Sequence, residues 1–268
     1  MTGDVGVLAS GGCHIFSGCG FPAPGLQDFD WKPFFHIGSF GFTKPMLLAI
    51  LAALVVIVFF WAAFRRPQLV PRGVQNLGEL AILAVRDQIL RPSLGRRGDS
   101  YLPFLVSLFF FIYIMNVMEL IPVFQFPVTS RIGFVWPMVF IVYFLYLYLG
   151  VKNQGAWGYL RSMIPPGVPW PIYIILVPVE LLRFFVFQPF TLGVRLFGNL
   201  FAGHLLLTIF TIATWYLLSL SVGLLYAVGS FALAIFVFVL ETLVTLLQAF
   251  IFTTLTATYI ASSVEPAH

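Results

Sequence analysis

Charge is what this sequence has least of. Asp, Glu, Lys and Arg together make up 9% of its 268 residues, whereas about 25% of a soluble domain is charged. Hydrophobic residues make up 60%, and phenylalanine alone occurs 31 times. A water-soluble core of this length has no use for so much apolar surface, and a β-barrel would show short alternating segments instead. The composition therefore predicts an all-α polytopic membrane protein.

The motifs of soluble catalysis are also missing. The sequence contains no GKS/T phosphate loop, CxxC pair, HExxH or GxSxG, so we expect neither a metal nor a cofactor. The net charge of +4 could suggest a nucleic acid, but the basic residues lie in loops that flank apolar runs. That placement is typical of membrane orientation. We therefore expect no nucleic-acid partner.

Cysteine is scarce as well. Cys13 and Cys19 are the only two, and both fall in a Gly-rich and Pro-rich stretch that precedes the first apolar run. They could close a small disulfide outside the cytoplasm or remain two unpaired thiols, and the residues leave both open. We divide the chain into residues 1–44, expected to be extracytoplasmic, and a membrane domain over 45–268.

Apolar runs predict the first three membrane helices over Pro45–Phe64, Tyr101–Pro122 and Val135–Val151. Each is close to the length of about 20 residues that spans a bilayer. Residues 70–90 differ, because they mix apolar side chains with Glu, Arg and Asp. That pattern favours an amphipathic helix lying on the membrane surface.

Two much longer apolar runs follow, Tyr173–Leu220 and Val222–Ser263. Each is about twice the length that a perpendicular helix needs, and an ordinary tilt of about 20° does not absorb the excess. Each run could be two spans with a hidden turn or one strongly tilted helix. We favour single tilted helices because 184–216 has no good turn beyond Gln188–Pro189. The expected total is five membrane-embedded helices plus the surface helix.

Basic residues in the loops predict the orientation. The stretch 65–100 carries seven of them, and 152–172 adds Lys152 and Arg161, whereas the opposite side has Lys32, Lys44 and Arg131. Nine against three places 65–100 in the cytoplasm. With five spans of the cell membrane, the N-terminus is then expected outside the cell and the C-terminus in the cytoplasm.

Six ionisable residues fall inside the expected spans. Such residues are costly in lipid and are functional by default. They are Glu119, Glu180, Arg183, Arg195, His204 and Glu241. Purely structural roles remain open for some of them. Glu180 and Arg183 are three residues apart and can pair on one helix face. Glu119 could be an interfacial carboxylate, and His204 could be packed and neutral.

Helical spacing separates these groups. At about 100° per residue, Thr191 and Asn199 share the face of Arg195, whereas His204 lies on the opposite face. Glu241 and Gln248 are seven residues apart and share a face of the last helix. A permanent cation on one face and a titratable group on the other favour a proton path with a separate electrostatic gate over a single ligand pocket.

Three stretches carry a resemblance to a known family. "NVMELIP" (116–122), "LGVRLFGNLFAGH" (192–204) and "LLQAFIFTTLTATYIA" (246–261) resemble the signatures of subunit a of the membrane (Fo) sector of rotary ATP synthases. The motifs occur in the family's order, and the resemblance covers about 45–263. In some bacterial relatives the residue types of His204 and Glu241 occur in reverse order.

The resemblance implies a proton-translocating stator subunit that is not catalytic alone. Two offset half-channels would face a rotating ring of c subunits, and Arg195 would be the essential arginine between them. The positions that match the outer half-channel are Asn116, Glu119, Asn199, His204, Glu241 and Gln248. Glu180 and Thr191 match the inner one. The implied partners are the c-ring, the peripheral stalk b subunits, other ATP synthase subunits, membrane lipid and the translocated H⁺, although Na⁺ stays open. The resemblance places the chain in the bacterial plasma membrane.

Two other readings compete. A small secondary ion transporter would show inverted repeats and Gly-broken helices near the midplane, and neither is found in the sequence. A purely structural membrane scaffold would leave the six intramembrane ionisable residues without a purpose.

Overall fold

The computed structural model describes residues 21, 35–37, 40–121, 128–130, 132–155, 157–159, 169–218 and 223–264. Cys13, Cys19 and most of the predicted N-terminal segment lie outside these residues, so the disulfide and the domain boundary remain predictions. The regular secondary structure of the described residues is helical apart from two antiparallel strands of three residues each, β1 (Phe35–Ile37) and β2 (Phe40–Phe42).

Five helical stretches are long and apolar enough to cross a membrane. They are Lys44–Phe64, Val74–Leu120, Gly133–Gln154, Ile172–Leu217 and Gly223–Val264. This confirms the prediction of an all-α polytopic membrane protein with five such helices. The first is α2 (Lys44–Phe64), which has Pro45 in its first turn and ends before Arg65.

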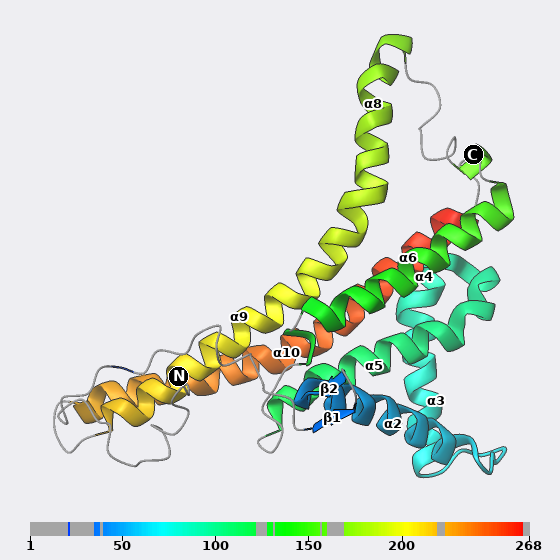
Figure 1. The fold of residues 1–268 in the computed structure, drawn as a ribbon. Helices are drawn as coiled ribbons and strands as arrows, with labels where there is room; N and C mark the ends of the chain where they lie inside the picture. The colour runs from blue at the N-terminus through cyan, green and yellow to red at the C-terminus, as the bar shows by residue number, and fades with distance from the viewer. Residues whose placement is uncertain are drawn as a thin grey trace.

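The expected surface helix is α3 (Val74–Val85) and its continuation (Figure 1). The π-helical turn η2 (Arg86–Leu90), the short α4 (Arg91–Leu94) and the 3₁₀ turns of η3 (Gly95–Tyr101) carry the chain from α3 into α5 (Leu102–Leu120). The helix therefore forms where the sequence predicted one. That it lies on the membrane surface stays a prediction.

A 3₁₀ turn, η4 (Val128–Ser130), precedes α6 (Ile132–Gln154). The next helix is continuous but bent, and consists of α8 (Trp170–Leu182), the π-helical turn η5 (Arg183–Phe187) and α9 (Gln188–Leu217) (Figure 1). In η5 the Gln188 N–H donates to the Arg183 carbonyl, five residues back. The wide turn comes directly before Pro189, which has no N–H to continue the α-helical pattern, and this accounts for the bend.

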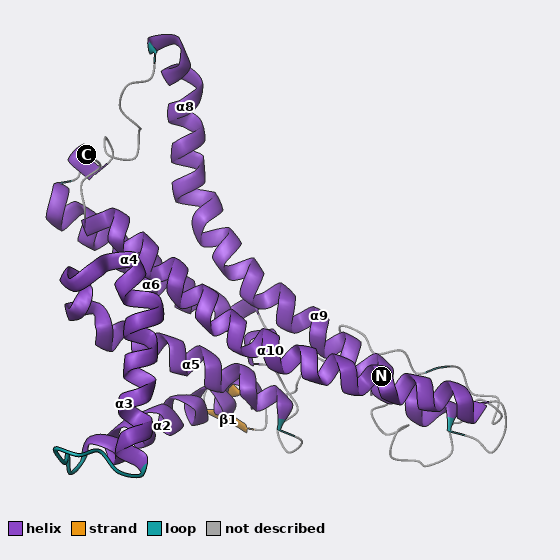
Figure 2. Cartoon of the chain, turned by 180° about the vertical axis from the view of Figure 1, so that it is seen from behind, coloured by secondary structure: helices purple, strands orange, loops and turns teal. Residues whose placement is uncertain are grey.

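The last helix, α10 (Gly223–Val264), runs 42 residues without interruption. The prediction of single long helices in place of paired spans is confirmed for both runs, whereas their tilt in the membrane stays a prediction. Figures 1 and 2 show α9 and α10 side by side and antiparallel, with α5 and α6 packed against α10. The core between these helices includes Ile112, Val139, Leu196, Leu200 and Ala249, all at most 1% exposed.

Candidate functional site

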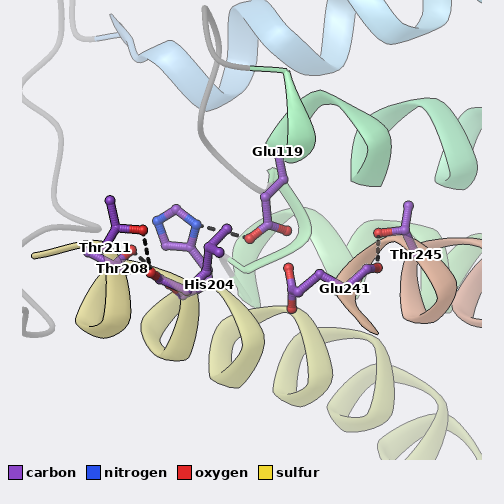
Figure 3. A network of polar contacts seen from close by, with 7 residues as sticks. Glu119, His204, Thr208, Thr211, Glu241 and Thr245 are labelled. Atoms are coloured by element: carbon purple, nitrogen blue, oxygen red, sulfur yellow. Dashed lines mark hydrogen bonds and ion pairs between the residues drawn. The ribbon is translucent and has the colours of Figure 1, made fainter. Parts of the chain in front are cut away.

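Three ionisable side chains from three helices meet where the end of α5 approaches α9 and α10 (Figure 3). His204 Nδ1, on α9, lies 2.9 Å from Oε1 of Glu119, on α5. The carboxyl group of Glu241, on α10, faces that of Glu119 and lies within hydrogen-bonding range of it. Glu119 and Glu241 are 4% and 1% exposed. Glu119 is thus a buried group at the centre of a polar cluster, and its depth relative to the membrane interface stays a prediction.

Gly203 makes room for this cluster. A Cβ built on Gly203 would overlap Oε1 of Glu241. The missing side chain therefore lets the Glu241 carboxylate lie directly against the backbone of α9. Packing of this kind explains a glycine next to a titratable histidine within a long helix, where glycine otherwise costs about 1 kcal/mol relative to alanine.

Asn116 extends the polar cluster by one turn of α5. Its Oδ1 accepts a hydrogen bond of 2.7 Å from Thr129 Oγ1 of η4, and both residues are 0% exposed. Within the described residues, Asn116 Nδ2, Glu119 Oε2 and Glu241 Oε2 are buried and have no hydrogen-bond partner. Buried polar atoms of this kind are normally satisfied by ordered water. We therefore expect ordered water beside these three atoms.

Arg195 lies on a different surface of α9. Thr191, Arg195 and Asn199, one turn apart from each other, are all exposed, as their spacing predicted. Among the residues that the structure describes, no carboxylate lies within ion-pair distance of the Arg195 guanidinium. The permanent cation is thus presented outward and is separate from the buried cluster of His204.

Gln248 fixes this part of α9 to α10. Its Nε2 donates a hydrogen bond of 2.8 Å to the backbone carbonyl of Arg195, and its side chain is 2% exposed. A helix carbonyl can accept this second bond because it has two lone pairs. The bond sets the position of Arg195 along α10 and leaves the guanidinium untouched.

Comparison with known proteins identifies the family of this chain. A family model described as "ATP synthase A chain" matches residues 46–261. The chain is 42% identical over 262 residues to ATP synthase subunit a of Streptomyces lividans, covering 96% of this chain and 92% of that protein. It is 40% identical over 250 residues to the subunit a of Frankia alni, covering 91% and 86%. With the subunit a of Rhodococcus erythropolis the identity is 39% over 246 residues, covering 90% and 89%.

The chain belongs to the ATP synthase A chain family. The match runs from the start of α2 almost to the end of α10, so it includes all the residues of the polar cluster and Arg195. The family membership that the three sequence motifs indicated is thereby confirmed. It makes the chain a membrane-embedded subunit of ATP synthase, and the roles of the individual residues remain to be argued from their geometry.

The two residues predicted for an inner path, Glu180 and Thr191, do not form a cluster as the outer residues do. Glu180 Oε2 accepts a hydrogen bond of 2.7 Å from Arg183 Nε across the junction of α8 and η5, which confirms the expected pair. The Thr191 hydroxyl donates to the Phe187 carbonyl at 2.6 Å, within its own helix. The two predicted inner-path residues therefore do not contact each other.

Sequence reasoning missed two residues of the site, Gly203 and Thr129. It paired His204 with Glu241, and the structure adds Glu119 to that pair: the imidazole lies 2.9 Å from Oε1 of Glu119, and Glu241 lies beside both groups. Gly203 could have been found, because a glycine beside a histidine is unusual in a helix interior. Thr129 carries no signal, since nothing in the sequence brings η4 against α5. Among the described residues, no group of three or more His, Cys, Asp or Glu side chains, including Glu119, His204 and Glu241, is arranged so that it could hold a metal ion.

Proposed function

We propose that this chain is the proton-translocating stator subunit of ATP synthase, with two offset half-channels that meet the rotating c-ring on either side of Arg195. In this proposal it is not catalytic alone, and it couples proton flow to the catalytic sector through the ring. It sits in the bacterial plasma membrane as a multi-pass protein, with its N-terminus outside and its C-terminus in the cytoplasm.

One observation carries the proposal: α9 holds an outward-facing cation without an ion-pair partner in the described chain, and on another of its faces it contributes His204 to a cluster of titratable side chains. A guanidinium in the membrane costs at least about 3 kcal/mol on insertion scales. That cost is tolerable when a carboxylate of another subunit faces the guanidinium. A ring of c subunits, each with one carboxylate, supplies such a partner repeatedly as it turns.

Arginine suits this position because it stays protonated at any physiological pH and so cannot relay protons itself. Its charge favours loss of the proton from a carboxylate that passes it. It also repels a proton that would cross directly between the half-channels. Lysine would not serve equally, since a desolvated ammonium can lose its proton.

The outer half-channel comprises Asn116, Glu119, His204 and Glu241, with Gln248 and Asn199 leading toward Arg195. What supports this path is the contact of His204 with Glu119, the adjoining Glu241 and the buried polar atoms that call for water. Such groups can pass a proton from one to the next through hydrogen bonds. In this proposal the conducted ion is H⁺, because imidazole is a proton carrier near neutral pH.

The inner half-channel involves Glu180 and Thr191. Its support is that both residues belong to the one continuous helix that carries Arg195, on the predicted cytoplasmic side of it. The exposed Thr191 lies one turn before Arg195, and the Glu180 carboxylate, held by Arg183, lies at the bend.

Cross-linking to the ring tests the proposal. Asn199→Cys places a thiol on the exposed face that carries Arg195, and Leu200→Cys places one at a neighbouring position that is 0% exposed. In intact ATP synthase with a cysteine beside the c-subunit carboxylate, we expect a disulfide with Asn199→Cys and none with Leu200→Cys. If the chain purifies in mild detergent without a c-ring, or if both positions cross-link equally, the result would favour a secondary ion transporter instead.

A further inference from the structure

A cavity of about 550 Å³ lies between the end of α2 and the start of α3, away from the polar cluster. Its lining includes Arg65, Arg66 and Arg72 together with Gln68 and Gln75, and no acidic residue. Its volume falls in the range of about 300–1,000 Å³ typical of small-molecule sites. None of its residues takes part in the proposed proton path.

The loop that forms the cavity is held in one conformation. The side chain of Gln75 accepts a hydrogen bond from the Gln68 backbone N–H and donates one to the Gln68 carbonyl, both at 2.9 Å. Its second N–H donates to Glu79 at 2.8 Å, and the residue is only 7% exposed. Pro67 and Pro71 flank Gln68, and each has a fixed φ. The arginines are thus presented by a preorganised turn.

The three arginines are not neutralised by the chain itself. Across the described ranges, none of them forms an ion pair, whereas Arg86 pairs with Asp99 at 3.0 Å. Arg65 instead lies over the ring of Trp61, 4.9 Å from its centroid. Three cations around one cavity repel each other, and an anion bound among them removes that repulsion.

The surroundings of the cavity are those of a membrane interface. It opens at the end of an apolar helix of 21 residues, where Trp61 is 60% exposed. Tryptophan at a helix end is typical of the headgroup level. In the loop itself, Leu69 and Val70 are fully and two-thirds exposed. A basic site bordered by exposed apolar side chains suits an anion that carries acyl chains.

We propose that this cavity binds the phosphate headgroup of an anionic phospholipid, with the guanidinium groups of Arg65, Arg66 and Arg72 around the phosphate and the acyl chains along Trp61 and the exposed face of α2. Basic pockets between membrane helices on the cytoplasmic side bind such headgroups. The site requires only that the chain is embedded in a membrane, so it stands apart from the mechanism proposed for Arg195.

The test is lipid binding to the full-length chain in intact ATP synthase, delipidated in detergent and titrated with phosphatidylglycerol. Bound lipid is counted by native mass spectrometry. The variant Arg66→Gln/Arg72→Gln removes two charges from the cavity, and at about 1 kcal/mol for each arginine the affinity should fall about 30-fold. The matched control Arg96→Gln/Arg97→Gln removes two exposed charges from η3 outside the cavity and should change the affinity less than about twofold.

Three further arms identify the ligand and the geometry. Phosphatidylcholine should bind to the wild-type complex no better than to the Arg66/Arg72 variant, and inorganic phosphate should not displace phosphatidylglycerol. Gln75→Met keeps all three charges but loses the bonds to Gln68, and should also weaken phosphatidylglycerol binding. Equal losses in the two double variants, equal binding of phosphatidylcholine, or displacement by inorganic phosphate would overturn the proposal. Binding by the free chain but not within the complex would assign the cavity to an acidic segment of a neighbouring subunit and would also overturn it.

Discussion

Glu119 is the side chain on which the proposed outer path depends most, because its carboxyl group contacts both His204 and the carboxyl group of Glu241. Glu119→Gln keeps the size and the hydrogen-bonding capacity but cannot exchange a proton. We expect ATP-driven proton pumping in inverted membrane vesicles to fall by about tenfold or more, as when a proton donor is removed from a relay. Glu79→Gln, on α3 outside this cluster, is the control. Normal pumping by Glu119→Gln would exclude the carboxyl group as a proton carrier.

The cluster also predicts the outcome of exchanging its outer members. His204→Glu alone gathers three carboxyl groups, and Glu241→His alone leaves Glu119 between two imidazoles, so each change should impair pumping. The double variant His204→Glu/Glu241→His again places one imidazole and one carboxyl group beside Glu119, and should recover part of the flux. The pumping rates of all four forms are compared at equal amounts of assembled enzyme. A double variant no better than the worse single one would show that the two positions act separately.

The spacing of residues along a helix was enough to predict which side chains of the site share one helix face. It placed Thr191, Arg195 and Asn199 on one exposed face, because residues four apart always share a face of a helix. It could not find that Glu119 is the partner of His204, since that contact joins residues 85 apart. Such a contact depends on how α5 packs against α9, which a repeat pattern within either helix does not contain.

At the scale of elements, Gly203 of α9 leaves the space that the Glu241 carboxylate of α10 occupies. A methyl group there would overlap the Glu241 carboxylate, so Gly203→Ala should push this carboxylate away from Glu119 and reduce proton pumping severalfold. Gly229→Ala is the matched control, because a Cβ at Gly229 of α10 meets nothing within 4 Å. Membrane levels of both variants are measured by immunoblot. Equal pumping by the two variants at equal levels would contradict the packing.

The bond from Gln248 to the Arg195 carbonyl is a second link between the same helices. Gln248→Leu removes the donor and should cost about 1 kcal/mol of stability. It should slow ATP synthesis but not uncouple it, because the guanidinium of Arg195 keeps its charge. Thr254→Val, which removes an exposed hydroxyl bonded within α10, is the control for both readouts. A Gln248→Leu enzyme that hydrolyses ATP without pumping protons would contradict this role.

Helix length could be predicted from the sequence, whereas helix shape could not. The absence of turn residues in 184–216 correctly predicted one continuous helix. Its bend comes from the π-helical turn before Pro189. A proline inside a helix indicates a kink, but Pro178 and Pro189 both lie within this run, and the sequence does not say at which of them the helix bends. The hairpin of β1 and β2 was not predicted, because its strands are only three residues each.

At the scale of the whole molecule, the arrangement of charge accounts for the function better than any single residue. The apolar surface holds the chain in lipid, the basic cavity lies at the end of α2, and the buried acids lie between α5, α9 and α10. The composition predicted that the chain lies in a membrane, and the number of basic residues in the loops gave a prediction of its orientation. Both predictions use counts of residues, which do not depend on how the helices pack. The orientation itself is checked by labelling: a cysteine added after His268 should react only with a reagent that reaches the cytoplasm.

Arg195 tests the central claim most directly. Arg195→Ala and Arg195→Lys are introduced into intact ATP synthase, and ATP synthesis driven by an imposed proton gradient is measured in vesicles, with Arg86→Ala, at an exposed pair with Asp99, as the control. We expect both Arg195 variants to assemble and to lose coupled synthesis, and Arg195→Ala also to leak protons between the half-channels. The control should synthesise ATP normally. Substantial coupled synthesis by Arg195→Ala would contradict the account, because the permanent charge would then not separate the two half-channels.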